Sequence, residues 1–299
     1  MTEDLVQPES TLGADEAIGN RVRQRFLVLH SGQSPADALA TMEPDGALME
    51  QAARKGAVWV KRRKPNGQMA KLTRLRDLTS DVLDGSELFA NINPNVLAAT
   101  VEKPTLLEQH KNYSFWFKPR GVLSQGSKWG DHTAISELVA NQLKRTTHLV
   151  HRLDRNACGI MVVAHTRPAV KELTALFAKR QVVKRYEAVV AGQWLATVPH
   201  RCEDSIDERR AFTEIESAEY VSLSDHSKLS VRLHTGRKHQ IRRHLAAMNY
   251  PILGDKRYGD EDSEMELALM ATELAFDCPF SNQSIQCFVP ESMRKSHLN

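Results

Sequence analysis

The sequence predicts an α+β protein in two parts, a small basic module and a larger domain built on a mixed, largely antiparallel sheet. Three observations lead to this prediction. The chain has 299 residues, enough for about two domains. Its larger, C-terminal part alternates short β-branched and aromatic runs with a few amphipathic helices. Its lysine and arginine residues are concentrated in two segments.

The composition excludes several classes of protein. With 41% apolar and 26% charged residues, the chain can bury a substantial core, so it is not disordered throughout. No apolar run reaches the ~18–20 residues of a membrane helix, and the opening MTEDLVQPES lacks the pattern of a signal peptide. The four cysteines form no C-x-x-C pair, which suits a reducing compartment. We therefore expect a cytoplasmic protein that contacts no membrane.

The net charge is only +3, but the charge is unevenly distributed. Residues 54–76 contain nine Lys or Arg residues and no acid. Residues 228–258 contain eight Lys or Arg residues, three histidines and one acid, Asp255. Runs of like charge are often only solvated surface. Two long runs nearly free of acid nevertheless favour a polyanionic partner, because phosphates bind cations that are not already neutralised.

Composition divides the chain into four segments. Residues 1–17 are acidic and lack periodicity, which predicts a flexible tail. The small module follows over residues 18–100. Residues 101–111 contain a proline and predict a linker, and residues 112–299 form the larger domain.

The small module begins with a helix signal. Ser34 can cap free amide groups, and Pro35 suits the first helical position, where no amide donor is needed. This helix should reach about residue 42. The remaining expected elements are a helix over residues 47–53, a strand over residues 57–60, a tight turn at residues 65–67 and a last strand after a turn at residues 82–88.

The larger domain reads as strands interrupted by two helices. Thr166 caps the first helix, directly before a proline. The second spans about residues 238–248, with Ile241, Leu245 and Met248 inward and its arginines mostly outward. The expected strands cover residues 113–117, 159–164, 186–191 and 229–233.

Four segments of this domain carry chemically informative residues. Residues 151–159 (HRLDRNACG) hold Asp154 between two arginines, directly before a strand. Alone, this aspartate could be half of a surface ion pair. The other segments follow in order: residues 184–186 (KRY), residues 233–245 (LHTGRKHQIRRHL) and residues 250–259 (YPILGDKRYG).

In this order, these segments resemble the RluA-like family of RNA pseudouridine synthases. The resemblance spans roughly residues 113–290 and begins with residues 118–122 (KPRGV), which match the family's lysine-proline-x-glycine segment. It implies the mixed-sheet fold of these synthases and an isomerase that modifies structured RNA, ribosomal or transfer RNA, without a cofactor. The reaction breaks a ribose–nitrogen bond and rejoins the ribose to carbon 5 of the same uracil. His151, His239 and His244 lack metal-ligand spacing, so we expect no metal site.

The resemblance implies three catalytic residues. Asp154 matches the catalytic aspartate, whose carboxylate attacks the anomeric carbon or removes a neighbouring ribose proton. Arg242 matches the arginine that pairs with it and keeps its pKa low, although a phosphate contact is an alternative. Tyr186 matches the tyrosine that stacks on uracil and assists proton loss at carbon 5; packing within a strand is the alternative.

The resemblance also implies RNA-binding residues. Arg152 matches the arginine that enters the RNA stack when the target nucleotide swings out, where a planar cation offsets part of the cost of extrusion. Lys118 and Arg237 are candidates for backbone or phosphate contacts.

The small module resembles, more weakly, the RNA-binding domain of the ribosomal-protein-S-four type. Its usual Asn-Gly is replaced by Lys61, Arg62 and Arg63, which are candidates for RNA contacts. A basic structural appendage is the alternative.

The chain departs from the catalytic family pattern at a few positions. Ala157 and Cys158 stand where the family usually has Thr or Ser, Phe117 replaces an asparagine, and Met270 replaces a histidine. None of these is a residue expected to carry the reaction.

Two other functions stay open. One is a catalytically inactive RNA-binding protein or ribosome assembly factor on the same fold. The other is a carboxylate-pair glycoside hydrolase, which is disfavoured because Asp154 lies among cations rather than beside a second acid. We expect the protein to be a monomer.

Overall fold

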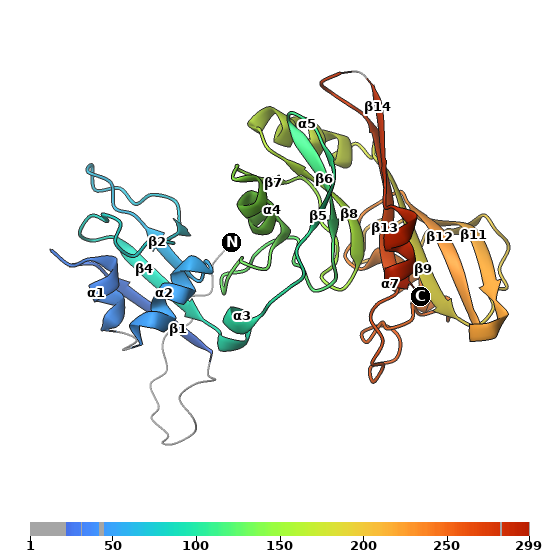
Figure 1. Ribbon diagram of the computed structural model, residues 1–299, viewed down its shortest axis with the longest axis horizontal. Helices are drawn as coiled ribbons and strands as arrows, with labels where there is room; N and C mark the ends of the chain where they lie inside the picture. The colour runs from blue at the N-terminus through green and yellow to red at the C-terminus, as the bar shows by residue number, and fades with distance from the viewer. Residues whose placement is uncertain (1–21, 31, 42–44, 282, 299) are drawn as a thin grey trace. The chain divides into compact units, whose positions relative to one another are not determined.

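The computed structural model describes residues 22–30, 32–41, 45–281 and 283–298. The chain forms two compact units, residues 1–99 with 128–130 and residues 100–127 with 131–299. In its described residues, each unit has its own sheet and hydrophobic core (Figure 1). The predicted acidic tail lies outside the described residues.

The small unit is built on a four-stranded antiparallel sheet in the order β1-β4-β2-β3. Helix α1 begins at the predicted signal, since the Asp37 amide donates to Ser34 Oγ at 3.1 Å and Pro35 takes the first turn. The helix ends earlier than predicted, at Ala40. The elements of this unit are β1 (Arg23–Val28), α1 (Pro35–Ala40), α2 (Gly46–Arg54), β2 (Val58–Lys61), β3 (Thr73–Arg74), β4 (Glu87–Ile92) and α3 (Pro94–Ala98).

The large unit contains a ten-stranded sheet in the order β10-β11-β12-β9-β13-β8-β6-β5, with β14 paired to β13 and β7 to β8. Its strands pair antiparallel except β8 and β13, which confirms the predicted mixed, largely antiparallel sheet. Its strands are β5 (Thr105–Gln109), β6 (Tyr113–Lys118), β7 (His148–Leu149), β8 (Cys158–Ala164), β9 (Val183–Ala191), β10 (His200–Cys202), β11 (Thr213–Val221), β12 (His226–Leu233), β13 (Leu269–Asp277) and β14 (Ser284–Phe288). Its helices are α4 (Ile135–Leu143), α5 (Arg167–Ala178), α6 (Gln240–Ala247) and α7 (Glu291–Leu298), with a short 3-10 turn at Ser222–Ser224.

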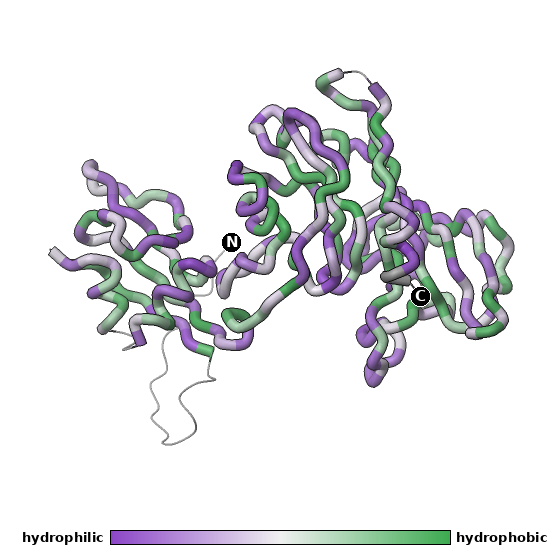
Figure 2. Tube along the Cα trace, in the orientation of Figure 1, coloured by the Kyte–Doolittle hydropathy of each residue, from purple (hydrophilic) through white to green (hydrophobic). Residues whose placement is uncertain are grey.

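Strands β6 and β8 are buried along their whole length. Alternate residues point to opposite faces of a sheet. Phe115 and Val162 accordingly belong to the cluster that includes Leu173 of α5. Trp116 and Met161 belong to the cluster that α4 covers on the other face. Figure 2 shows hydrophobic positions along the strands and hydrophilic ones in the connecting loops.

Helix α6 packs its predicted apolar residues inward. Ile241 and Leu245 are buried in the cluster formed by β9, β11 and β12, and Met248 packs against it. The expectation that the arginines of this helix point mostly outward is wrong for Arg242, which is buried. None of the helices within the described residues combines the length and apolar composition needed to cross a bilayer.

The segment expected as a linker, residues 101–111, contains a strand. β5 pairs antiparallel with β6 at the edge of the sheet. All of its residues are exposed or half-buried, so its sequence lacks the continuous apolar run of an interior strand. Pro104 precedes the strand, a position where its missing amide costs no ladder hydrogen bond.

Gly159 permits the close approach of β8 and β13. Its φ is +118°, and a Cβ at this position would lie 2.1 Å from the Ala271 carbonyl oxygen. Ala271 pairs with Gly159 on one side and with Tyr186 on the other. This glycine therefore helps to fix the spacing between the strand that follows Asp154 and the strand that carries Tyr186.

We predict that Gly159→Ala lowers the free energy of unfolding by about 3 kcal/mol, because the new methyl group would overlap the backbone of β13 and φ is unfavourable for alanine. Urea unfolding followed by circular dichroism measures the loss. Gly236→Ala is the control, because its Cβ would enter open space; it should change stability by less than about 0.5 kcal/mol. Equal effects of the two substitutions would contradict the explanation.

Candidate functional site

The loop between β7 and β8 holds Asp154 between two anchored residues. On one side, the Leu153 amide donates to Ser124 Oγ at 2.9 Å, and the Ser124 hydroxyl donates to the Leu153 carbonyl. On the other side, the Gly121 amide donates to the Arg155 carbonyl at 2.9 Å. The Asp154 side chain is 27% exposed. The backbone therefore fixes a carboxylate that solvent still reaches.

Arg242 of α6 faces this carboxylate but is held by another. Its Nε and Nη2 atoms donate to the two Asp255 carboxylate oxygens at 2.8 and 2.7 Å. Its Nη1 atom lies 3.6 Å from Asp154 Oδ2. The Arg242 side chain is 7% exposed. The guanidinium is thus fixed in place by a bidentate pair, with one nitrogen left to face Asp154.

Asp255 is a site residue that the sequence interpretation missed. Its Oδ1 atom also accepts the backbone amides of Arg257 at 3.0 Å and Tyr258 at 3.1 Å. Burial alone would raise the pKa of Asp255, but the hydrogen bonds and charge of Arg242, together with these amides, lower it. One feature of the sequence could have identified this residue: Asp255 is the one acid in the basic segment of residues 228–258.

His239, at the start of α6, also lies beside the Asp154 carboxylate. Its Nε2 atom is 3.8 Å from Asp154 Oδ1, and its Nδ1 atom is 2.9 Å from the Tyr258 hydroxyl. Burial lowers the pKa of His239 despite the negative charge of Asp154, so the ring is neutral at neutral pH. Tyr258 also lies 5.1 Å from the Arg242 guanidinium, across its ring face. His239 and Tyr258 are further neighbours of the site that were not among the predicted residues.

Tyr186 of β9 completes the site. It lines a cavity of about 470 Å³ together with Asp154, Arg242 and His239. Burial and the negative charge of Asp154 raise the pKa of Tyr186 above its usual value, so the hydroxyl keeps its proton at neutral pH. The structure therefore brings Asp154, Tyr186 and Arg242, the three predicted catalytic residues, to one cavity.

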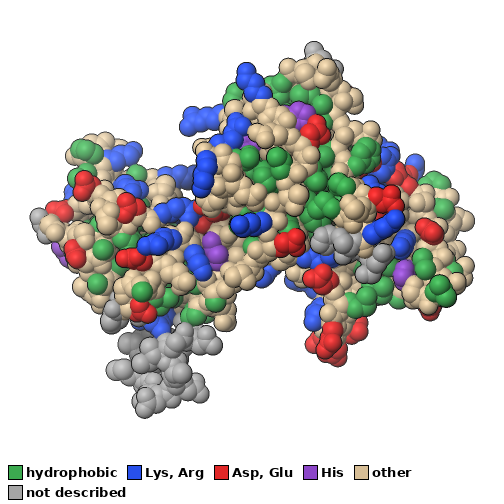
Figure 3. Space-filling view, viewed as in Figure 1, with side chains coloured by type: hydrophobic (Ala, Val, Ile, Leu, Met, Phe, Trp, Pro, Cys, Tyr) green, Lys and Arg blue, Asp and Glu red, His purple; other side chains and the backbone are tan. Residues whose placement is uncertain are grey.

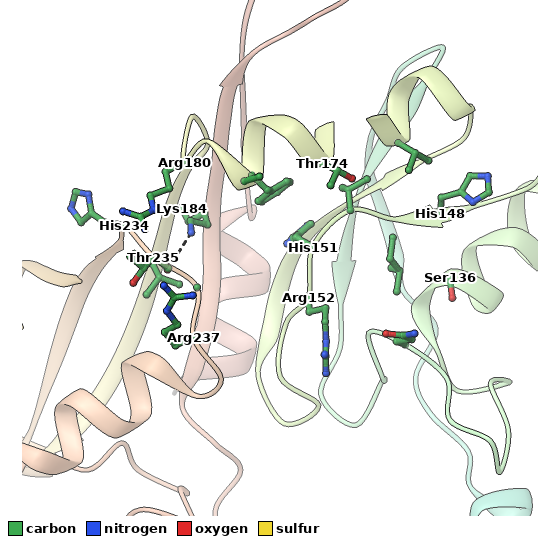
Figure 4. A pocket seen from close by; sticks show the side chains of 18 of the residues that line it. Ser136, His148, His151, Arg152, Thr174, Arg180, Lys184, His234, Thr235 and Arg237 are labelled. Carbon is green, nitrogen blue, oxygen red and sulfur yellow. Dashed lines mark hydrogen bonds between the residues drawn. The ribbon is translucent and has the colours of Figure 1, made fainter. Parts of the chain in front are cut away.

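Arg152 and Arg237 lie at this cavity too. Arg152 is exposed, and Arg237 is half-buried with its Nε atom donating to the Arg210 carbonyl at 3.1 Å. Both also line a larger adjoining cleft (Figure 4). Their positions leave both guanidinium groups beside the space that a substrate would enter.

The structure does not support the predicted RNA contact for Lys118. Its side chain is fully buried, and its Nζ atom donates to the carbonyls of Pro119 at 2.9 Å, Val122 at 3.0 Å and Arg155 at 3.3 Å. Burial lowers the pKa of Lys118 to about 7. Lys118 therefore stabilises the loop that carries Asp154, and a phosphate in solvent does not reach it.

The other three predicted RNA-binding residues lie in the small unit, on β2 and directly after it. Lys61 Nζ lies 3.5 Å from a Glu87 carboxylate oxygen, and Arg62 donates to the Thr73 hydroxyl at 3.3 Å. Arg63 is exposed. Lys61 is thus partly neutralised, while the two arginines keep their charge available.

Within the part of the chain that the structure describes, no group of three or more His, Cys, Asp or Glu side chains is arranged to hold a metal ion. The four cysteines are all buried and unpaired.

Comparisons with known proteins identify relatives of the large unit. Residues 112–247 match the sequence model of a family described as RNA pseudouridylate synthase. Ribosomal large subunit pseudouridine synthase D of Vibrio cholerae is 32% identical over 206 residues, which cover 58% of this chain and 63% of that protein. The chain thus spans less than two thirds of that relative. The tRNA pseudouridine synthase C of Vibrio parahaemolyticus is 28% identical over 56% of this chain and 82% of that protein.

Among solved structures, human RNA pseudouridylate synthase domain containing 1 has a TM-score of 0.55 at 21% identity, covering 67% of this chain and 88% of that chain. Human RNA pseudouridylate synthase domain containing 4 has a TM-score of 0.50 at 23% identity, covering 65% and 92%. These similarities show that the large unit shares their fold.

We predict that Asp255→Asn lowers stability by about 3 kcal/mol at pH 7, because it leaves the buried Arg242 guanidinium without its anionic partner. The pKa of Asp255 is lower in the folded protein than in the unfolded chain. Its contribution is therefore fully present above the unfolded pKa of about 3.9 and is lost as the pH falls through the folded pKa. The stability difference between wild type and variant should accordingly shrink below about pH 4.

Urea unfolding at a series of pH values checks this prediction. Asp262→Asn is the matched control, because it makes the same substitution at an exposed position of the same loop. It should change stability by less than about 0.5 kcal/mol at every pH. A difference between wild type and Asp255→Asn that stays constant with pH would show that the carboxylate charge is not responsible.

Proposed function

The chain belongs to the RluA-like family of RNA pseudouridine synthases, and from this premise we propose that it converts particular uridines to pseudouridine in structured RNA. The observation that carries the proposal is the shared cavity of Asp154, Tyr186 and Arg242. The names of the relatives specify ribosomal and transfer RNA, so both are candidate substrates. The reaction uses no cofactor, because the leaving uracil is itself the group that is reattached.

Asp154 supplies the carboxylate of the reaction. It attacks the anomeric carbon of the target ribose or removes the neighbouring ribose proton while the bond to nitrogen breaks. An Arg242 nitrogen lies 3.6 Å from this carboxylate and faces it. Because Asp255 holds the arginine, this cation keeps its place while the charge on Asp154 changes during the reaction.

Tyr186 supports the uracil during its rotation. Its protonated hydroxyl is a hydrogen-bond donor at the cavity wall, and its ring offers a surface on which the base stacks. Arg152 is exposed beside the cavity and fills the space that the extruded nucleotide leaves in the RNA stack. Arg237 contacts the RNA backbone.

The small unit contributes affinity rather than chemistry. Its basic run is partly neutralised, since Arg54 pairs with Glu50 at 2.8 Å and Lys61 with Glu87 at 3.5 Å. Figure 3 shows basic and acidic side chains interspersed over the visible face of this unit. Arg62 and Arg63 are the residues of this run that we assign to RNA phosphates.

We predict that Asp154→Asn abolishes turnover and leaves RNA affinity nearly unchanged, because the amide is almost isosteric with the carboxylate but is neither a nucleophile nor a base. Tritium release from transcripts labelled at carbon 5 of uridine measures the reaction, with ribosomal and transfer RNA tested separately. Asp262→Asn should release tritium at the wild-type rate. An Asp154→Asn rate within about tenfold of wild type, an effect of ~1.4 kcal/mol on the barrier, would exclude the assignment.

We also predict that replacing Arg62 and Arg63 together by glutamine weakens the binding of bulk transfer RNA and lowers the slope of log Kd against log salt by about 1.5, because each phosphate contact releases counterions. Arg54→Gln is the control, since Glu50 already neutralises this residue of the same basic run. Titrations at several salt concentrations give both slopes. An unchanged slope in the double variant would show that this basic run is only solvated surface.

A further inference from the structure

A cleft of about 960 Å³ adjoins the catalytic cavity. Arg152, Tyr186 and Arg237 line both spaces, so the two are neighbours. The cleft alone is at the upper end of the ~300–1,000 Å³ range of small-molecule pockets. Together, the two spaces have room for more than the target nucleotide.

The lining of this cleft is cationic. None of the residues that line it is Asp or Glu. Figure 4 shows Arg180, Lys184 and Arg237 along one wall, with His151 and Arg152 between this wall and the opposite one. The arginine and lysine residues of the lining are Arg152, Arg180, Lys184 and Arg237.

Arg180 and Lys184 form a pair of cations without a neutralising acid. No ion pair among the described residues includes either of them, whereas the next residue on β9, Arg185, pairs with Glu216 and Glu273 at 2.8 Å each. Lys184 is half-buried, and its Nζ atom donates to the Thr235 carbonyl at 3.3 Å. Burial and the charge of Arg180 lower the pKa of Lys184 to about 8. An anion bound between the two would relieve this repulsion.

The same cleft offers an apolar surface beside the cations. Val170, Phe177 and Leu233 line it, and the Phe177 ring stacks on His151 with centroids 4.4 Å apart. Cations that track phosphates next to apolar and aromatic surface are typical of sites for single-stranded nucleic acid. A small free anion would need neither the volume nor this surface.

We propose that the larger cleft is a subsite for the RNA strand flanking the target uridine, in which Arg180 and Lys184 hold one backbone phosphate. The proposal rests on the proposed function for the identity of the polyanion. The RNA contact is thereby assigned to Arg180, which lies just after the end of α5. This residue is outside all of the sequence segments that the family resemblance singled out.

The test uses the full-length chain and a fluorescent single-stranded oligouridylate of about ten nucleotides, with Kd measured at several salt concentrations. Arg180→Gln should weaken binding about fivefold at ~0.1 M salt and lower the log–log slope by about 0.7, the value for one phosphate of a single strand. Arg180→Lys should keep the wild-type slope. Lys179→Gln is the matched control, because it removes the same charge from the adjacent exposed residue outside the cleft. It should weaken binding less than about twofold, with an unchanged slope.

Equal effects of Arg180→Gln and Lys179→Gln, or no binding of the oligouridylate by the wild type, would overturn the subsite. Tritium release from labelled RNA shows whether a negative binding result concerns the subsite alone or the proposed function. If the wild type isomerises uridine but the two variants behave alike, the subsite is wrong and the function stands. If Arg180→Gln alone changes the slope but no tritium is released, the RNA subsite stands and the proposed reaction is wrong.

Discussion

The buried ion pair between Arg242 and Asp255 is the interaction on which the candidate site depends. Burying a guanidinium without a partner costs several kcal/mol, so its position in the folded protein is dictated by the carboxylate that satisfies it. Asp255 takes two nitrogens of this group and orients the third toward Asp154. The cation beside the Asp154 carboxylate is therefore held by Asp255 and does not depend on Asp154 for its place.

The sheet connects the remaining parts of the site. Strand β13 lies between β8 and β9, and its residue Ala271 pairs with both Gly159 and Tyr186. Ala271 of β13 thus fixes two strands relative to each other. One is β8, which follows the Asp154 loop, and the other is β9, which carries Tyr186. A glycine at position 159 is a condition for this spacing, since the backbones approach too closely to admit a Cβ there.

Local signals in the sequence predicted much of this fold, and long-range pairing explains what they missed. Ser34 and Thr166 cap their helices as expected, because capping involves only the next few residues. Strand β5 was missed because an edge strand needs no apolar pattern. The sequence shows a lysine at position 118, but it does not show that three carbonyls surround the side chain of Lys118. Likewise, nothing in the sequence shows that Asp255 pairs with Arg242, because this pairing is formed only in the folded chain.

The double anchoring of the Asp154 loop has a consequence for the nucleic acid. Ser124 holds Leu153, and Gly121 and Lys118 hold Arg155, so the backbone on both sides of the carboxylate has little freedom to follow a substrate. In the proposed reaction, the rearrangement that brings a stacked uridine to this carboxylate must then take place in the RNA. Under the proposed function, a carboxylate held this rigidly selects its target by the deformability of the RNA, which favours nucleotides in loops and bulges over those within a continuous helix.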